Sequence, residues 1–209
     1  MPPTEFLIAL AIGYALGSIP FGLIVSALLG KGDLRQVGSG NIGATNAVRA
    51  GGKGMGALVL LLDIAKGAVP VLIAKSQFAP GAEIYAAFGA FIGHCYPIWL
   101  KLKGGKGVAT LLGLLLGLNP QIALMYAVVW LAMFVLTRIS SVAGMTAALS
   151  APLGAWLSGS ADYLPLLLGL AVLVIYKHRT NIARLARGEE PRSGSGPKEK
   201  SSGYERRSS

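Results

Sequence analysis

The chain has 209 residues, of which 53% are hydrophobic and 13% are charged, and its mean hydropathy is +0.60. Soluble domains carry about 25% charged residues, so this composition excludes an ordinary soluble domain and is typical of an integral membrane protein. The net charge of +10 at pH 7 therefore indicates which membrane face the charges occupy rather than a nucleic-acid partner, and the single cysteine excludes an internal disulfide bond.

Seven apolar segments predict an all-α polytopic membrane protein, a seven-helix transmembrane bundle. A spanning helix needs about 20 mainly apolar residues, so several of these segments are predicted as short or broken spans, and the count lies between five and seven. In chain order the segments are Thr4–Leu29, Met55–Ala74, Ala82–Leu100, Gly107–Leu118, Gln121–Thr137, Ser140–Leu157 and Tyr163–Tyr176. The chain then divides into a transmembrane domain, residues 1–190, and a basic cytoplasmic tail, residues 191–209, whose polar low-complexity sequence predicts disorder.

The positive charges predict the orientation of the bundle. With seven spans, every Lys and Arg except Lys66 and Lys75 falls on one face. By the positive-inside rule that face is cytoplasmic, which puts the N-terminus outside and the C-terminus inside. Lys31, Lys53 and Lys177 are interpreted as setting this topology only. Every motif described below lies on the same cytoplasmic face.

The first motif is GSGNIGATNAVRAGGKG, residues 38–54. Glycines let backbone N–H groups turn toward a ligand, and successive N–H groups form nests that bind anions. Polar side chains, including an arginine suited to phosphate, follow at close spacing: Ser39, Asn41, Thr45, Asn46 and Arg49. A flexible loop between helices is the alternative, but this density of polar side chains favours ligand binding.

The second motif is KLKGGKGVAT, residues 101–110. It places Gly-Gly-Lys-Gly ahead of a predicted helix, whose N-terminus offers free N–H groups and the positive end of the helix dipole to an anion. Lys106 adds a full charge, and Thr110 lies about one turn into the helix. The Walker A pattern is absent. A basic loop with glycine hinges is the alternative, and we favour anion binding.

The third motif is YKHRTNIARLARGEE, residues 176–190. His178 and Asn181 share a face if the last helix continues, and spacing alone leaves a site role and an anchoring role at the membrane boundary equally open. The short turn TRISS places Ser140 and Ser141 where either a helix cap or a ligand contact fits.

Two further polar features lie inside predicted spans. Asp63 and Lys66, three residues apart, are interpreted as a buried pair that is either structural or a brace for the site, because charges in a membrane are costly and usually paired. His94 is interpreted as a buried histidine with its hydrogen bonds satisfied. The sequence offers no His/Cys cluster and no nucleophile paired with a base, so we expect neither a metal nor a cofactor.

Five blocks carry a resemblance to a known family. They are GSIPFG (17–22), SGNIGATNAVR (39–49), LDIAKG (62–67), GHCYPIWLKLKGGKGVAT (93–110) and KHRTNIARLARGEE (177–190). In this order they resemble the bacterial acyl-phosphate:glycerol-3-phosphate acyltransferase family over nearly the whole chain before the tail. Lys101 and Leu102 stand where the family pattern has a small residue and an aromatic one, and Cys95 and Tyr96 also depart from it.

The resemblance implies an enzyme of the bacterial cytoplasmic (inner) membrane. It would transfer a fatty acyl group from acyl phosphate to the 1-hydroxyl of sn-glycerol 3-phosphate, giving lysophosphatidic acid and phosphate, the first acylation of phospholipid synthesis. It also implies a seven-helix bundle with the site on the cytoplasmic side. The expected partners are the two substrates and membrane lipid, without acyl-CoA or acyl carrier protein, and the protein is expected to act as a monomer.

That reaction needs two phosphate sites, and we assign roles accordingly. The residues expected to hold glycerol phosphate and the reacting groups are Ser39, Arg49, Lys106, His178 and Asn181. The backbone N–H groups expected to cradle phosphate lie around Gly40, Gly43, Gly104, Gly105 and Gly107. The side chains expected to orient donors near the carbonyl are Asn41, Thr45, Asn46 and Ser141, and Thr110 completes the binding set. His178 and a phosphate oxygen of a substrate are alternative acceptors of the hydroxyl proton.

Two other classes of protein compete with an enzyme. A transporter of a phosphorylated small molecule would also use basic loops and broken helices, but it predicts polar groups on both faces of the bundle. A membrane scaffold with a lipid-binding tail would explain the basic tail and leave the glycine loops without a role.

Overall fold

The computed structural model describes residues 3–193, and within this range every regular element is a helix. Short 3₁₀ turns lie at Leu34–Gln36, Ile98–Leu100 and Ala161–Tyr163. The α-helices are, in chain order, α1 (Pro3–Gly17), α2 (Phe21–Leu28), α3 (Ala44–Gln77), α4 (Ala82–Cys95), α5 (Val108–Leu118), α6 (Pro120–Thr137), α7 (Ser140–Leu157), α8 (Leu164–Lys177) and α9 (Arg179–Ala186).

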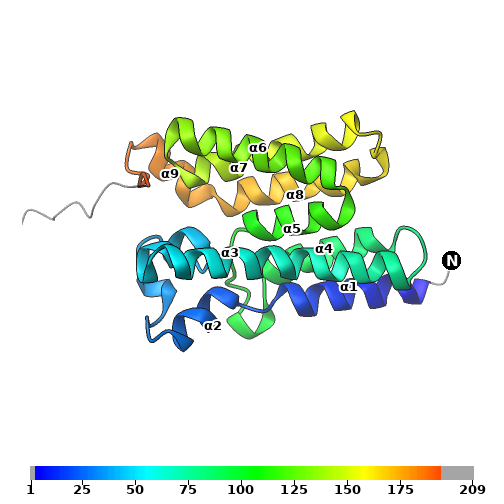
Figure 1. Ribbon diagram of the computed structural model, residues 1–209, viewed down its shortest axis with the longest axis horizontal. Helices are drawn as coiled ribbons and strands as arrows, with labels where there is room; N and C mark the ends of the chain where they lie inside the picture. The colour runs from blue at the N-terminus through cyan, green and yellow to red at the C-terminus, as the bar shows by residue number, and fades with distance from the viewer. Residues whose placement is uncertain (1–2, 194–209) are drawn as a thin grey trace, which may run out of the picture.

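The long helices lie along one axis in two groups (Figure 1). Helices α1, α3 and α4 form one group, and α6, α7 and α8 form the other. The short helix α5 lies between them and contacts α3 and α4 on one side and α6 and α7 on the other. The main core is built around it, from buried side chains such as Phe91, Leu114, Leu115, Tyr126 and Leu170.

Several helices have the length and the surface of membrane spans. Three segments are long and apolar enough to cross a membrane: Thr4–Leu28, which comprises α1 and α2, Ala44–Gln77 and Pro120–Thr137. The pair Ala161–Lys177 and Arg179–Ala186, bent by 55°, is a fourth candidate. Large apolar side chains remain exposed on the outside of the bundle, including Leu61, Leu124 and Val172, as expected where lipid replaces water. The fold is therefore that of a multi-pass helical membrane protein.

Two predicted helix boundaries are wrong near the first motif. The predicted span Thr4–Leu29 is divided into α1 and α2, because Pro20 lacks a backbone N–H and restricts the residue before it. Helix α3 begins at Ala44 rather than at Met55. Gly52, with φ 82° and ψ −179°, interrupts α3, so the first motif runs into a helix that breaks before it enters the span.

The third predicted span is also shorter than expected. Helix α4 ends at Cys95 rather than at Leu100, because Pro97 cannot continue a helix. The last four predicted segments agree with α5 to α8 to within a residue. Helix α9 was not expected as a separate element. The predicted tail lies outside the described residues from residue 194 onward.

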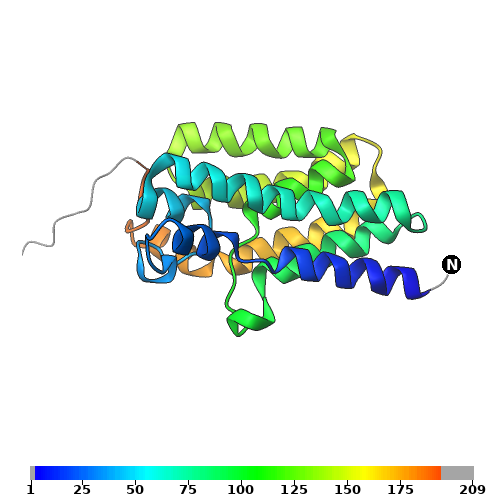
Figure 2. The same ribbon diagram turned by 60° about the horizontal axis from the view of Figure 1, so that its bottom comes forward.

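Two of the three connections that carry the motifs lie at one end of the bundle, and the third projects from its side. The α2–α3 and α8–α9 connections lie at the end opposite the start of α1 (Figure 1). The α4–α5 connection projects from the side of the bundle (Figure 2). It is tied to the end of α8, because Lys177 Nζ donates a hydrogen bond of 3.0 Å to the carbonyl oxygen of Cys95.

Candidate active site

One buried amide organises the loop that precedes α3. Asn46 is 1% exposed. Its Nδ2 donates to the carbonyl oxygens of Leu34 at 2.8 Å, Val37 at 3.0 Å and Asn41 at 2.8 Å. Its Oδ1 accepts a hydrogen bond of 3.2 Å from the backbone N–H of Ser39. Because both ends of the amide are bound within the loop, Asn46 shapes the loop and does not face a substrate.

Left-handed glycines turn the same loop outward. Gly38 and Gly40 have φ values of 53° and 69°, which glycine adopts without strain. Ser39 lies between them and is exposed. Arg49, one turn further along α3 than Asn46, is exposed and lies beside Gly38, since a Cβ added there would be 3.1 Å from Arg49 Cδ.

The α4–α5 connection folds back onto the end of α4. The N–H of Gly104 donates to the carbonyl of Cys95 at 3.2 Å, and the N–H of Gly105 donates to that of His94 at 3.1 Å. A Cβ on Gly104 would overlap the His94 carbonyl oxygen, so only glycine fits there. Gly107, with φ 82°, is the N-cap residue of α5 and provides no side-chain cap, so the N–H groups of the first turn of α5 stay available to an anion.

These backbone bonds limit which N–H groups can form the predicted phosphate cradle. The N–H groups of Gly104 and Gly105 are donated to carbonyl oxygens, and that of Gly40 is donated to Val37 at 2.9 Å. A backbone donor that is already bound inside the protein cannot also hold a phosphate without losing that bond. In this geometry the three glycines provide shape and close approach rather than donors.

The two loops and the α8–α9 junction enclose a cleft of about 180 Å³. Three cationic side chains, Lys106, Lys177 and Arg179, meet there, and the residues that line the cleft include no carboxylate. Clustered positive charge at a partly desolvated surface attracts anions. The lining residues are Ser39, Gly40, Asn41, Gly104, Gly105, Lys106, Lys177, Arg179 and Thr180.

A chain of polar side chains fixes Lys106 from behind the cleft. Lys106 Nζ donates to Asn181 Oδ1, and Asn181 Nδ2 donates to Glu190 Oε1. The same oxygen accepts a hydrogen bond of 2.7 Å from Ser141, and Glu190 Oε2 accepts one of 2.7 Å from Arg184 Nε. The side chain of Glu190 is 6% exposed. The amide of Asn181 thus connects the cation of the cleft to a buried anion.

The surroundings lower the pKa of both Lys106 and Glu190, which favours the neutral form of the lysine and the charged form of the glutamate. The pKa of Lys106 is lowered to about 8, mainly by burial; Glu190 opposes this shift, and the positive charges of Arg184, Lys177 and Arg49 add to it. Burial by itself would raise the pKa of Glu190, but the hydrogen bonds from Asn181, Ser141 and Arg184 outweigh it and the pKa is lowered. Glu190 is therefore a carboxylate at neutral pH, whereas Lys106 titrates close to the physiological range.

His178 lies at the junction between α8 and α9 and is 2% exposed. Its Nδ1 is 2.8 Å from the carbonyl oxygen of Val174, an acceptor, so we assign the ring proton to Nδ1 and the free lone pair to Nε2. Burial lowers the pKa of His178 to about 4. The imidazole is therefore neutral at neutral pH.

The sequence and the fold both match known proteins. Residues 7–188 match the family described as glycerol-3-phosphate acyltransferase. The chain belongs to this family. It is 56% identical over 190 residues to the glycerol-3-phosphate acyltransferase of Erythrobacter litoralis, covering 91% of this chain and 96% of the relative. The corresponding enzyme of Mesorhizobium japonicum is 50% identical over 90% of this chain and 96% of its own length.

Solved structures agree with the family assignment. The acyltransferase superposes with a TM-score of 0.86 on the glycerol 3-phosphate form of PlsY (YgiH), an integral membrane glycerol 3-phosphate acyltransferase, at 43% identity over 90% of this chain and 96% of that one. The lysophosphatidic acid form of PlsY gives a TM-score of 0.82 at 39% identity, covering 90% of this chain and 94% of that one. The prediction of an enzyme of this family is confirmed.

The acyltransferase fold brings most predicted site residues into one region and separates a few from it. In the cleft wall are Ser39, Gly40, Asn41, Gly104, Gly105 and Lys106, and behind it lie Ser141, His178 and Asn181. Gly43 and Gly107 are the N-cap residues of α3 and α5, and Thr45 is half-buried in the first turn of α3. Thr110 is completely buried and lies 3.0 Å from His94 Nδ1, outside the cleft wall.

Sequence reasoning missed several residues of this region. Lys177 was interpreted as a topology signal, yet it lines the cleft together with Arg179 and Thr180. Their position next to His178 could have indicated this, because they leave the last span with it. Nothing in the sequence distinguishes Glu190 from its exposed neighbour Glu189; only the fold shows that Glu190 reaches Asn181 and Ser141.

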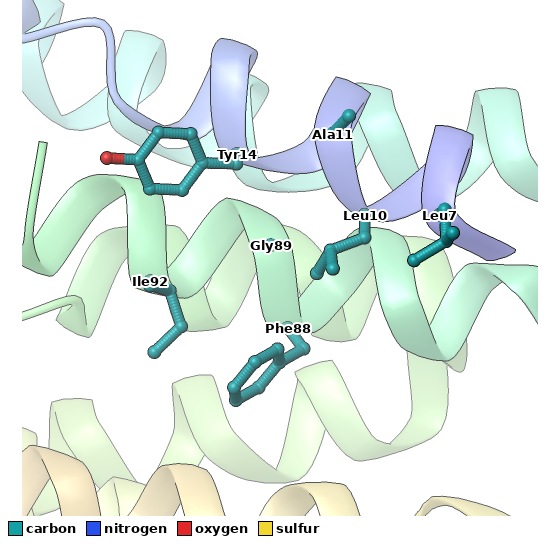
Figure 3. Close-up of a pocket in the computed structure, with 7 residues that line it drawn as sticks. All are labelled: Leu7, Leu10, Ala11, Tyr14, Phe88, Gly89 and Ile92. Carbon is teal, nitrogen blue, oxygen red and sulfur yellow. The ribbon is translucent and has the colours of Figure 1, made fainter. Parts of the chain in front are cut away.

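A larger depression of about 360 Å³ lies between α1 and α4 (Figure 3). Its wall is apolar apart from Tyr14, whose hydroxyl is bound to the backbone of Tyr96 and Ile98. It contains no cation that could bind a phosphate. The smaller cleft, where cationic side chains meet, is therefore the candidate active site. The residues that line the larger depression between α1 and α4 are Leu7, Leu10, Ala11, Tyr14, Phe88, Gly89 and Ile92.

Proposed function

We propose that this acyltransferase takes the acyl group from acyl phosphate and transfers it to the 1-hydroxyl of sn-glycerol 3-phosphate, releasing lysophosphatidic acid and inorganic phosphate. The observation that carries the proposal is the cleft in which Lys106, Lys177 and Arg179 meet without a carboxylate in its wall. Both substrates and both products carry a phosphate group, so several cations are needed at one place. The related PlsY structures are described as a glycerol 3-phosphate form and a lysophosphatidic acid form. They support glycerol 3-phosphate as the acceptor and lysophosphatidic acid as the product.

The proposed step is a single acyl transfer. The 1-hydroxyl oxygen forms a bond to the acyl carbon, the bond from that carbon to the phosphate oxygen breaks, and the phosphate leaves with the bonding pair. Because the mixed anhydride is already activated, positioning and neutralisation of charge supply the rate. Ser39, Lys106, Asn181 and His178 are the groups proposed to act at the reacting centre, and Arg49 assists with its charge.

The hydroxyl proton is proposed to move to a phosphate oxygen of a substrate. The alternative acceptor, Nε2 of His178, belongs to a ring whose pKa is about 4. A general base works best when its pKa is close to the operating pH, and the second pKa of a phosphate monoester, about 6, is closer than that of this ring. The variant His178→Gln tests the choice: a kcat within about threefold of wild type excludes His178 as the base.

The bundle is proposed to have seven spans in the bacterial inner membrane, with the N-terminus outside and the cleft on the cytoplasmic face. The charge distribution supports this orientation. The working unit is proposed to be a monomer. No step of the transfer calls for a cofactor or a metal.

The test is phosphate release by the purified protein in a lipid mesophase, with palmitoyl phosphate in the presence and absence of glycerol 3-phosphate. We expect release that depends on glycerol 3-phosphate and that matches the formation of lysophosphatidic acid mole for mole. Release without the acceptor would indicate hydrolysis instead. Folded protein that gives no turnover, but moves labelled glycerol 3-phosphate into sealed proteoliposomes, would contradict the donor assignment and indicate a transporter.

A further inference from the structure

A chain of buried polar side chains runs beneath the cleft without taking part in its wall. Lys66, Asp63, His94 and Thr110 are each at most 5% exposed. Lys66 Nζ lies 2.8 Å from Asp63 Oδ1, the same oxygen lies 4.0 Å from His94 Nδ1, and Thr110 Oγ1 lies 3.0 Å from that nitrogen. Four polar residues from α3, α4 and α5 thus meet inside an apolar bundle.

The far side of the His94 ring touches the glycine loop. A Cβ added to Gly105 would overlap Nε2, and its two next nearest neighbours would be ring carbons of the same imidazole. The carbonyl of His94 also accepts the hydrogen bond of 3.1 Å from the Gly105 N–H. Gly105 therefore rests on His94 through both the ring and the backbone, one residue before Lys106.

On the side away from Gly105, the His94 ring is held by residues of α3 and α5. Thr110 lies in the first turn of α5, and the buried Asp63 lies on α3, where Gly67 would overlap the Thr110 carbonyl if it carried a Cβ. Helices α3 and α5 thus cross at backbone contact beside the ring. Such a crossing leaves little freedom for Thr110 or Asp63 to move.

The same chain reaches the other loop of the cleft. Lys66 Nζ donates a hydrogen bond of 2.8 Å to the carbonyl of Ile19, at the break between α1 and α2. Helix α2 in turn carries the first loop, because Gly22 lies so close to Ile42 that a Cβ would overlap its carbonyl oxygen. The row of buried polar side chains therefore connects the loop before α3 with the α4–α5 connection.

Burying such a group of polar side chains inside a membrane costs free energy, so its presence calls for a functional explanation. Charged side chains within spans carry a cost that apolar residues of the same volume would avoid. A charged pair, a histidine and a threonine that together contact both loops of one binding cleft indicate a positioning function.

We propose that His94 is a positioning residue, which Thr110 and the Asp63–Lys66 pair hold in place so that its ring sets the Gly104–Lys106 segment for binding the phosphate of glycerol 3-phosphate. His94 itself makes no contact with the substrate in this scheme. The proposal rests on the proposed function only for the identity of the ligand, since the geometry concerns the loop that carries Lys106.

The test removes the support and measures binding and turnover separately. Thr110→Val keeps the side-chain shape but loses the hydroxyl, and His94→Asn keeps a polar atom near Nδ1 but loses the part of the ring under Gly105. In both variants we expect the KM for glycerol 3-phosphate to rise about tenfold, the typical effect of one lost buried hydrogen bond. The KM for palmitoyl phosphate and the kcat should each change by less than about threefold.

Two further variants serve as controls. Thr110→Ser restores the hydroxyl and should bring the KM for glycerol 3-phosphate back to within about twofold of wild type. Ser150→Ala removes another buried hydroxyl, one whose hydrogen bond of 2.8 Å stays within α7, and should leave both KM values unchanged. Thermal unfolding of each purified variant shows whether it is folded.

The outcomes separate this inference from the proposed function. Equal increases in both KM values, or an unchanged KM for glycerol 3-phosphate in folded Thr110→Val and His94→Asn, would overturn the positioning role. Equilibrium binding of radiolabelled glycerol 3-phosphate, competed with inorganic phosphate, needs no acyl donor. If wild type binds but does not turn over palmitoyl phosphate, the donor assignment fails, and the binding constants of the variants still decide the role of His94.

Discussion

Asn181 is the residue on which the electrostatics of the cleft depend. Its two amide atoms have opposite polarity: Oδ1 accepts from Lys106, and Nδ2 donates to Glu190. An amide in this place separates a cation from an anion while bonding to both. A carboxylate could bind Lys106 equally well, but it would face Glu190 with a like charge.

This polarity predicts the effect of an exchange. Asn181→Asp should lower kcat/KM by at least about tenfold, because adjacent residues of one network couple strongly. Adding Glu190→Gln restores an amide–carboxylate pair in the reverse order, so the double variant should be at least about fivefold more active than Asn181→Asp alone. Strictly additive losses in this double-mutant cycle, measured as kcat/KM for both substrates, would show that the amide does not act as the link.

The low pKa of Lys106 predicts an alkaline limit to activity. A lysine is charged below its pKa, so the positive charge that holds a phosphate is lost as the pH rises through about 8. The kcat/KM for glycerol 3-phosphate, which reports the free enzyme, should therefore fall above that pH, by up to about tenfold per unit. Lys106→Arg should move this fall upward by at least about one unit, because a guanidinium stays charged.

The position of the alkaline fall, and not the height of the profile, is the readout. The arginine fork differs in shape from an ammonium group, so the variant is expected to be less active at every pH. An alkaline fall at the same pH in both proteins would assign it to another group. Glycerol 3-phosphate titrates identically in both assays and cancels from the comparison.

At the residue scale, the sequence predicted cleft residues better than their roles. Ser39, Asn41 and Lys106 stood out because small polar and basic residues among glycines are rare inside an apolar chain. The buried role of Asn46 could not be read in the same way, because an amide that binds its own loop and one that binds a ligand look identical in a sequence. Glu190 depends on a contact with Ser141, 49 residues away in the chain, which no local pattern encodes.

Glycines at helix crossings allow α3 and α5 to pack at close distance beside the cleft. A Cβ on Gly113 of α5 would overlap the carbonyl oxygen of Ile64 on α3. Without side chains at the crossing, two helices can pack backbone to backbone, which is the usual way in which helices associate in lipid. The position of Thr110, one turn before Gly113, follows directly from this contact.

The crossing predicts different effects for two glycine variants. Gly113→Ala should separate α3 from α5 and destabilise the protein by about 1–3 kcal/mol, the usual cost of overpacking. Gly169→Ala in α8 is the matched control, because a Cβ there meets nothing within 4 Å, and alanine favours a helix by up to about 1 kcal/mol over glycine. Thermal unfolding in detergent should show a lower Tm only for Gly113→Ala; equal Tm values would contradict the close contact.

At the element scale, hydropathy predicted the spans and missed their interruptions. Apolar runs of the right length identify helices because lipid demands internal hydrogen bonding, and α5 to α8 appear where they were predicted. The breaks at Pro20, Gly52 and Pro97 depend on single residues within apolar or mixed stretches. A window average does not resolve them, although the backbone restrictions of proline could have been applied to the first and third spans.

The whole molecule has a chemical polarity along its long axis. Every Lys and Arg of residues 3–193 except Lys66 and Lys75 lies in the α2–α3, α4–α5 or α6–α7 connection, at the start of α3, at the end of α8, or from α9 onward. Lys66 is buried in an ion pair, and Lys75 Nζ is bound to the carbonyl of Leu118. Since the positive face of a membrane protein is retained in the cytoplasm, the cleft should receive its water-soluble substrate from the cytoplasm.

Single cysteines at the two ends test this orientation. Lys31 precedes the first motif and Ser76 lies near the end of α3, and both are exposed; the native Cys95 is buried, so wild type provides the blank. A membrane-impermeant maleimide should label Lys31→Cys in inverted membrane vesicles and Ser76→Cys in intact spheroplasts, each without reaction in the other preparation. Reversed labelling would put the cleft outside and overturn the proposed orientation. Labelling of both positions from one side would mean that α3 does not span, and the seven-span arrangement would then fail while the cleft itself stayed intact.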